Sequence, residues 1–130
     1  MSMEMIVVRL NALVFLLYGI GFLVLPEALS RFVTDTVPRT VSGIVDMRAT
    51  YGGMSVAVGV MLLVLASGYE TVRKGLVGVL LLMLSMAGGR ILGMLVDGAG
   101  NPVMGGYLVL EIVMAVIAFW LLIRTPRQAG

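Results

Sequence analysis

The sequence contains neither cysteine nor histidine. Without these residues the chain cannot form a disulfide, a thiolate or histidine metal site, an iron–sulfur cluster or a histidine-ligated haem. Catalysis by a thiol is excluded for the same reason. A metal site would have to consist of carboxylates alone, and the chain has only 7 acidic residues. We therefore expect no metal and no cofactor.

Charged residues are also scarce. They make up 12% of the 130 residues, whereas hydrophobic residues make up 60%, and ordinary soluble domains carry about 25% charged residues. So few polar groups cannot cover a soluble domain of this size, and lipid is the solvent that accepts such a surface. A net charge of +2 is too small to indicate binding to nucleic acid.

Four apolar runs are long enough to cross a bilayer, whose core of about 30 Å needs roughly 20 apolar residues per helix. They cover residues 5–25, 44–66, 75–96 and 103–123, and turn-forming or charged residues bound each run. The first run is too long for a cleaved signal peptide, so we interpret it as a retained span. The sequence thus predicts an all-α integral membrane protein, folded as a four-helix transmembrane bundle in a single domain, 1–130.

Basic residues are distributed unevenly between the two sides of this predicted bundle. An even number of spans places both termini on one side. That side carries Arg9, Arg73, Lys74, Arg124 and Arg127, and the opposite side carries Arg31 and Arg39 in its long loop, with Arg48 near a helix end. Because lysine and arginine accumulate in cytoplasmic loops, we expect both termini in the cytoplasm.

The long loop after the first span has two readings. Residues 26–33 can form a short helix with Leu29, Phe32 and Val33 on one side, which would lie at the outer membrane interface. The alternative is a plain loop packed on the bundle.

Small residues recur at helical spacing in three spans, and small residues let membrane helices approach closely. The third span has Ser85, Gly89 and Gly93, the second has Gly52, Ser55 and Gly59, and the first has Ala12 and Gly19. The spacing does not separate packing within one chain from oligomerisation, and we expect packing within the chain. The 11 methionines are either adaptable filler or the wall of a lipophilic site.

Ionisable residues inside the spans are the most specific feature, because charges at membrane depth usually face the bundle interior. Asp46 and Arg48 lie one turn into the second span, beside Tyr51. Arg90 lies about 10 Å, and Glu111 about 12 Å, from the same predicted surface. Asp97 ends the third span. The sequence therefore predicts a charged layer in the outer third of the membrane.

Three interpretations of this charged layer remain open. Its charges can be ion pairs that lock the bundle, with Glu111 on Arg90 and with Asp46 or Asp97 beside Arg48. They can line a pocket in which Arg48 and Arg90 hold an anionic headgroup. They can also form a proton or ion path through Glu111.

The segments Asp46-Met-Arg48-Ala49-Thr-Tyr51-Gly52-Gly53 and Gly89-Arg90-x-x-Gly93-x-x-x-Asp97-Gly98, followed by Glu111, resemble a family. It is a family of small four-span bacterial membrane proteins known as a domain of unknown function, with hydropathy like that of DoxX-type proteins. The likeness covers nearly the whole chain. It implies a four-helix bundle in the bacterial cytoplasmic (inner) membrane and marks Asp46, Arg48, Tyr51, Arg90, Asp97 and Glu111, but brings no established activity.

Our leading hypothesis is a non-enzymatic membrane protein whose charged outer-leaflet site binds a membrane lipid or another amphipathic molecule. The same hypothesis includes docking of a partner membrane protein at that site, and it admits a homo-oligomer as a further partner. The alternative is an oligomeric transporter of a small molecule or ion, with Glu111 as the proton or cation site. A lipid-modifying enzyme is less favoured, because no nucleophile–base arrangement is recognisable.

Overall fold

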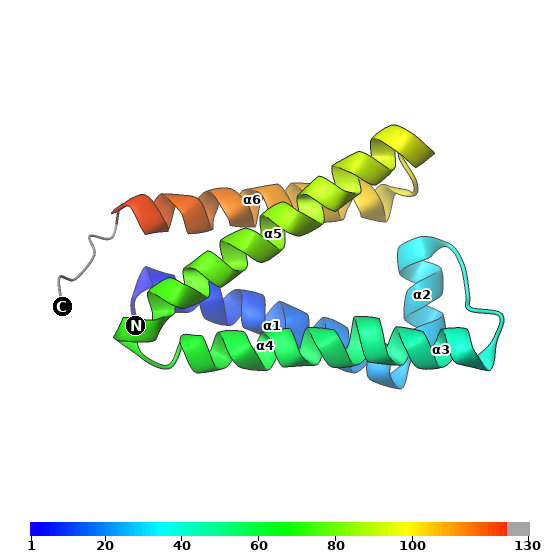
Figure 1. The fold of residues 1–130 in the computed structure, drawn as a ribbon, viewed down its shortest axis with the longest axis horizontal. Coiled ribbons are helices and arrows are strands. Elements are labelled where there is room, and N and C mark those ends of the chain that lie inside the picture. The colour runs from blue at the N-terminus through cyan, green and yellow to red at the C-terminus, as the bar shows by residue number, and fades with distance from the viewer. Residues whose placement is uncertain (125–130) are drawn as a thin grey trace. The chain divides into compact units, whose positions relative to one another are not determined.

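The protein is built from helices. The computed structural model describes residues 1–124, and no strand occurs among them. Arg127, one of the residues used for the predicted orientation, lies outside this range. In chain order (Figure 1) the elements are α1 Met3–Val24, α2 Pro26–Thr34, α3 Val41–Met47, the π-helical η1 Arg48–Gly53, α4 Met54–Leu65, α5 Tyr69–Asp97 and α6 Pro102–Arg124.

Four helical stretches are long and apolar enough to cross a membrane, the second being α3, η1 and α4 together. They contain 22, 25, 29 and 23 residues. All four begin before the predicted spans, and the last two also end later. Many large apolar side chains point outward, among them Leu13, Leu17, Leu81, Leu95, Val116 and Phe119. Soluble proteins rarely expose such continuous apolar surface, and the predicted all-α membrane protein with four spans is confirmed.

The chain divides into two compact units, which we describe separately. The first, the α1–α4 unit, comprises residues 9–64. The second, the α5–α6 unit, comprises residues 1–8 and the chain from residue 65 onward.

In the α1–α4 unit, α1 packs against the second span through small residues. A Cβ added at Gly59 would lie 2.6 Å from Cγ of Leu16 and 2.9 Å from the carbonyl oxygen of Ala12. At Gly19 an added Cβ would lie 2.7 Å from the carbonyl oxygen of Gly52. The backbones of the two helices therefore approach so closely that only glycine fits. For these two spans, the predicted packing within the chain is confirmed.

The second span contains one π-helical turn, η1, at Arg48–Gly53. A π-helix makes i→i+5 hydrogen bonds, so it holds more residues per turn than an α-helix, and such turns often occur at functional sites. Residues on either side of the turn that would share one face of a regular α-helix therefore lie on different faces. It falls within the Asp46–Gly53 segment of the family resemblance, and the ring of Tyr51 stacks on Phe22 there with centroids 5.2 Å apart.

Residues 26–34 form the helix α2, so the helical reading of the long loop is correct and the plain loop is not. Pro26 occupies the first helical turn, where its missing N–H is tolerated. Asp35 ends the helix with φ 57°. Val33 is buried, whereas Phe32 is exposed. Leu29 lies beside α1, because a Cβ added at Gly21 would be 2.7 Å from its Cδ1.

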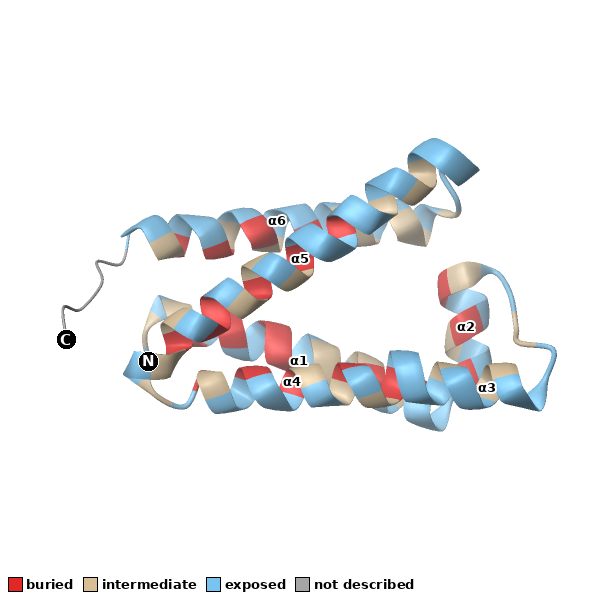
Figure 2. Ribbon diagram, viewed as in Figure 1, coloured by how far each residue is buried: buried red, intermediate tan, exposed pale blue. Residues whose placement is uncertain are grey.

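In the α5–α6 unit the two helices run antiparallel, joined by a short turn (Figure 1). At one end Nη2 of Arg73 donates to the carbonyl oxygen of Leu122 at 3.0 Å, and Val8 lies against Gly75. The start of α5, the end of α6 and the first residues of α1 thus lie at the same end of this unit. Buried residues follow a three-to-four spacing on facing sides (Figure 2): Leu76, Val79, Met83 and Ala87 on α5, and Glu111, Ala115, Ala118 and Leu121 on α6.

Within the α5–α6 unit, the predicted small-residue seam of the third span does not face α6, and its contact with the first two spans stays a prediction. Ser85 is exposed, and a Cβ added at Gly89 or Gly93 would have nothing within 4 Å. The buried face of α5 is the one that carries Met83 and Ala87, and it is rotated away from these small residues. The same spacing of small residues thus marks a helix contact in the second span but no contact with α6 in the third. The spacing alone does not show which face of a helix meets its neighbour.

Candidate functional site

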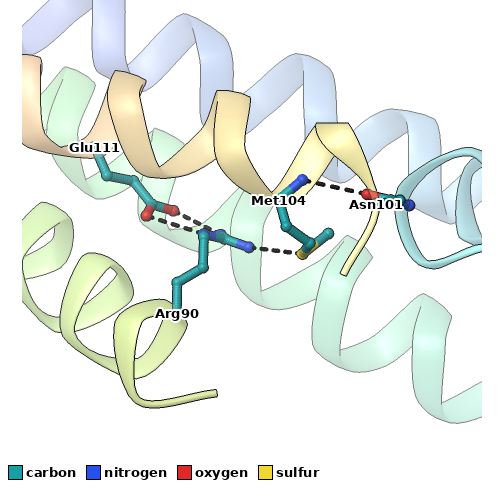
Figure 3. Close-up of polar contacts among 4 residues, drawn as sticks. All are labelled: Arg90, Asn101, Met104 and Glu111. Carbon is teal, nitrogen blue, oxygen red and sulfur yellow. Dashed lines mark hydrogen bonds and ion pairs between the residues drawn. The ribbon is translucent and has the colours of Figure 1, made fainter. Parts of the chain in front are cut away.

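Arg90 on α5 and Glu111 on α6 form an ion pair with two parallel hydrogen bonds (Figure 3). Nη2 donates to Oε1 at 2.6 Å and Nε donates to Oε2 at 3.1 Å. The Glu111 side chain is 5% exposed and that of Arg90 is 16% exposed. The expected pairing of these two residues across the third and fourth spans is present, and bidentate geometry is the strong form of this interaction.

Two further side chains of α6 surround the guanidinium of Arg90. Its Cζ lies 5.1 Å from the centre of the Tyr107 ring, an arrangement in which the ring face attracts the cation. Its Nη1 donates to the sulfur of Met104 at 3.2 Å. Tyr107, Met104 and Glu111 lie three or four residues apart, so one face of α6 supplies all three contacts. Tyr107 and Glu111 are four residues apart in the sequence, which by itself places them on one helix face, whereas no sequence pattern singles out Met104.

Asn101 fixes the position of Met104 at the start of α6. The backbone N–H of Met104 donates to Oδ1 of Asn101 at 3.2 Å and to its carbonyl oxygen at 3.1 Å (Figure 3). Asn101 directly precedes the helix and Pro102 is its first residue. Asparagine followed by proline is a favourable helix start. The amide oxygen accepts a hydrogen bond from a backbone N–H of the first turn, and proline has no N–H that would need an acceptor there.

A groove of about 350 Å³ lies beside Arg90 in the α5–α6 unit. Its wall consists of Arg90, three methionines (Met86, Met94 and Met104), Gly89, Gly93 and the turn at residues 98–100. Gly98 begins this turn with φ 105°, a conformation that other residues rarely adopt. Asp97 is the last residue of α5 and is exposed next to the groove. The groove is therefore apolar and adaptable along its length, with a guanidinium at one edge.

The residues marked on the second span have other contacts. Arg48 Nη1 donates to the carbonyl oxygen of Leu23, near the end of α1. Asp46 accepts a hydrogen bond of 3.4 Å from Oγ1 of Thr50. The expected pairing of Arg48 with Asp97, which belongs to the other unit, stays a prediction, and the alternative ion pair of Arg48 with Asp46 is not formed among the described residues. The reason is that the last carbonyls of α1 lack partners within their own helix, and the guanidinium satisfies one of them.

These contacts separate the six marked residues into two groups. Arg90, Asp97 and Glu111 belong to the α5–α6 unit, and Arg90 and Glu111 meet there. Asp46, Arg48 and Tyr51 belong to the α1–α4 unit, where Arg48 caps α1 and Tyr51 packs on Phe22. A single charged layer built from all six stays a prediction. Among residues 1–124, no group of three or more acidic residues is placed to hold a metal ion.

Comparison with known proteins agrees with the sequence resemblance. No curated protein and no solved structure matches the chain. One family model does match, over residues 3–122, and it is described as a domain of unknown function (DUF4345). Since the match covers nearly the whole chain, this small membrane protein belongs to the DUF4345 family.

Proposed function

We propose that this protein is a non-enzymatic membrane protein that holds an amphipathic molecule in the groove beside Arg90. The observation that carries the proposal is the position of the groove against the Arg90–Glu111 pair, whose carboxylate is buried. Small-molecule sites are typically mostly apolar, have volumes of roughly 300–1,000 Å³ and contain a few polar groups that fix orientation. A methionine-rich wall with one guanidinium at its edge has this composition, and an amphipathic molecule matches both parts.

The membrane position belongs to the same proposal. We place the protein in the bacterial cytoplasmic membrane with both termini in the cytoplasm. The contacts of Val8 with Gly75 and of Arg73 with Leu122 support a common side, because they bring both ends of the described chain to one end of the α5–α6 unit. The basic residues Arg73, Lys74 and Arg124 gather at that end, as cytoplasmic ends do.

Docking of a partner membrane helix has a separate basis. At Gly88, Gly105 and Gly106 an added Cβ would meet nothing within 4 Å, and open glycines allow close helix approach. We favour the small molecule because the groove also carries a polar group that could orient a ligand. Transport of a proton or cation by Glu111 has less support, because both carboxylate oxygens already accept from Arg90.

The test compares two neighbouring glycines of α5. Gly89 lines the groove and Gly88 does not, while neither has an atom within 4 Å of an added Cβ. Gly89→Leu therefore places a side chain in the groove at a position where an added Cβ meets no atom, and Gly88→Leu is its matched control. We expect native mass spectrometry to detect bound lipid mass in the wild type and in Gly88→Leu, but much less in Gly89→Leu. Equal lipid occupancy in all three proteins would contradict the groove as the binding site.

A further inference from the structure

Met104 occupies a position that a ligand oxygen could take. Its sulfur accepts from Nη1 of Arg90 at 3.2 Å, and its side chain lines the groove. The Asn101 cap holds its backbone, whereas the unbranched side chain is free to change rotamer. Moving the thioether aside would expose the Nη1 edge of the guanidinium to the groove and leave the Glu111 pair intact.

The thioether is a poor match for this donor. A methionine sulfur is a weak acceptor, whereas a guanidinium N–H is a charged, strong donor. A carbonyl oxygen in the same place would make a stronger hydrogen bond. A ligand that supplies such an oxygen therefore gains more from Arg90 than it loses by displacing Met104.

The charges around the groove decide what kind of oxygen is favoured. Glu111 offsets the charge of Arg90 through two hydrogen bonds, and the exposed carboxylate of Asp97 directly precedes Gly98 in the groove wall. Within the α5–α6 unit, an anionic headgroup would add a negative charge beside Arg90, Glu111 and Asp97, which together carry no excess positive charge, and unpaired charge at membrane depth is costly. An uncharged carbonyl adds none. This argument departs from the anionic headgroup expected from the sequence.

We infer that the ligand of the groove is an uncharged amphiphile whose carbonyl oxygen displaces the sulfur of Met104 from Arg90. Its apolar chain would lie along Met86 and Met94, which line the same groove. The inference rests on the proposed function. It adds the chemical class of the ligand and identifies Met104 as the residue that the ligand displaces.

The test uses two variants of Met104 and three probes in native mass spectrometry. Met104→Leu removes the competing acceptor at similar volume, and Met104→Gln places a strong amide acceptor of similar length in the same position. The probes are 1,2-dioleoylglycerol, which is uncharged and carries ester carbonyls, dioleoylphosphatidylglycerol, which is anionic, and squalene, which has no oxygen. Thermal unfolding of each variant reports whether the fold is retained.

We expect the wild type to retain dioleoylglycerol more strongly than either other probe. Loss of one hydrogen bond of ordinary strength corresponds to about a fivefold change in affinity. Because the sulfur makes a weaker hydrogen bond, Met104→Leu should bind dioleoylglycerol up to about fivefold more tightly than the wild type, and Met104→Gln should bind it several-fold more weakly. Preference for phosphatidylglycerol or squalene would overturn the inference, as would a Met104→Leu variant that binds no better than the wild type.

The two proposals fail separately. If Gly89→Leu lowers lipid binding but the Met104 variants and the probe charge have no effect, the groove binds lipid and only the Met104 inference is wrong. If Gly89→Leu has no effect on any probe, the groove is not the binding site and the proposed function falls with the inference.

Discussion

Arg90 and Glu111 lie on different helices, α5 and α6, and are joined by two hydrogen bonds of 2.6 and 3.1 Å at the edge of the groove. The pair therefore has two roles in our account. It fastens the two helices at a depth where apolar side chains give little specificity, and it presents a guanidinium to whatever enters the groove.

The first prediction concerns the strength of this pair. Arg90→Met leaves the buried carboxylate of Glu111 without its partner, which we expect to cost about 3–5 kcal/mol of unfolding free energy. The double variant with Glu111→Gln should recover part of this loss, because no isolated charge remains. Denaturation in mixed detergent micelles measures the wild type, the two single variants Arg90→Met and Glu111→Gln, and the double variant. Single losses that simply add in the double variant would show that the two residues do not interact.

Lys74→Met is the control for this cycle. Lys74 is an exposed cation on the same helix as Arg90, so its removal tests whether any loss of positive charge from α5 is destabilising. We expect it to leave the unfolding transition almost unchanged, as most exposed substitutions do.

A second prediction concerns the end of α1, which Arg48 caps from η1. Arg48→Leu removes the donor to the carbonyl of Leu23, so the last turn of α1 should open more often. Because Arg48 is exposed, we expect a global loss of only about 1 kcal/mol. Hydrogen exchange should be faster around residues 20–25 and unchanged elsewhere. Arg39→Leu, at an exposed arginine of the loop before α3, should change neither quantity.

The third prediction contrasts two glycines with opposite surroundings. A Cβ at Gly59 would lie 2.9 Å from the backbone oxygen of Ala12, whereas a Cβ at Gly88 would meet nothing. Gly59→Ala should push α1 and α4 apart and cost about 1–3 kcal/mol. Gly88→Ala should instead stabilise the protein by about 0.5–1 kcal/mol, because alanine favours helix. Thermal unfolding that moves in the same direction for both variants would contradict the packing described for α1 and α4.

A fourth prediction concerns orientation. Arg73, Lys74 and Arg124 lie near the ends of α5 and α6 that we place in the cytoplasm. A reporter that is active only in the cytoplasm should therefore be active when fused after Gly130, and inactive when inserted in the loop at residues 36–39. The reverse pattern would invert the orientation while leaving the four spans intact.

The sequence was sufficient for the features that depend on composition and on side-chain type. Long apolar runs predict membrane helices because the bilayer demands them, and two buried groups of opposite charge on neighbouring spans predict a pair. The four helices and the contact of Arg90 with Glu111 follow from these two rules.

The remaining features depend on contacts that leave no sequence pattern. Arg48 binds a backbone carbonyl, and any residue has one, so its partner Leu23 could not be found from side-chain chemistry. The π-helical turn at Arg48–Gly53 requires no particular residue type, so no sequence pattern marks its extra residue. Gly59 and Gly89 belong to equivalent small-residue patterns, yet Gly59 meets α1 within its unit whereas Gly89 does not meet α6 within its own.

The central claim is that the groove beside Arg90 holds an amphiphile, and photo-crosslinking tests it most directly. A diacylglycerol with a diazirine in one acyl chain is incubated with the protein in neutral detergent, illuminated and mapped by peptide mass spectrometry. We predict that labelling concentrates on the groove residues Met86 and Met94, and that it is competed by unlabelled dioleoylglycerol and reduced in Gly89→Leu but not in Gly88→Leu. Labelling spread evenly over outward-facing residues such as Leu81 and Val116, without competition, would contradict the claim.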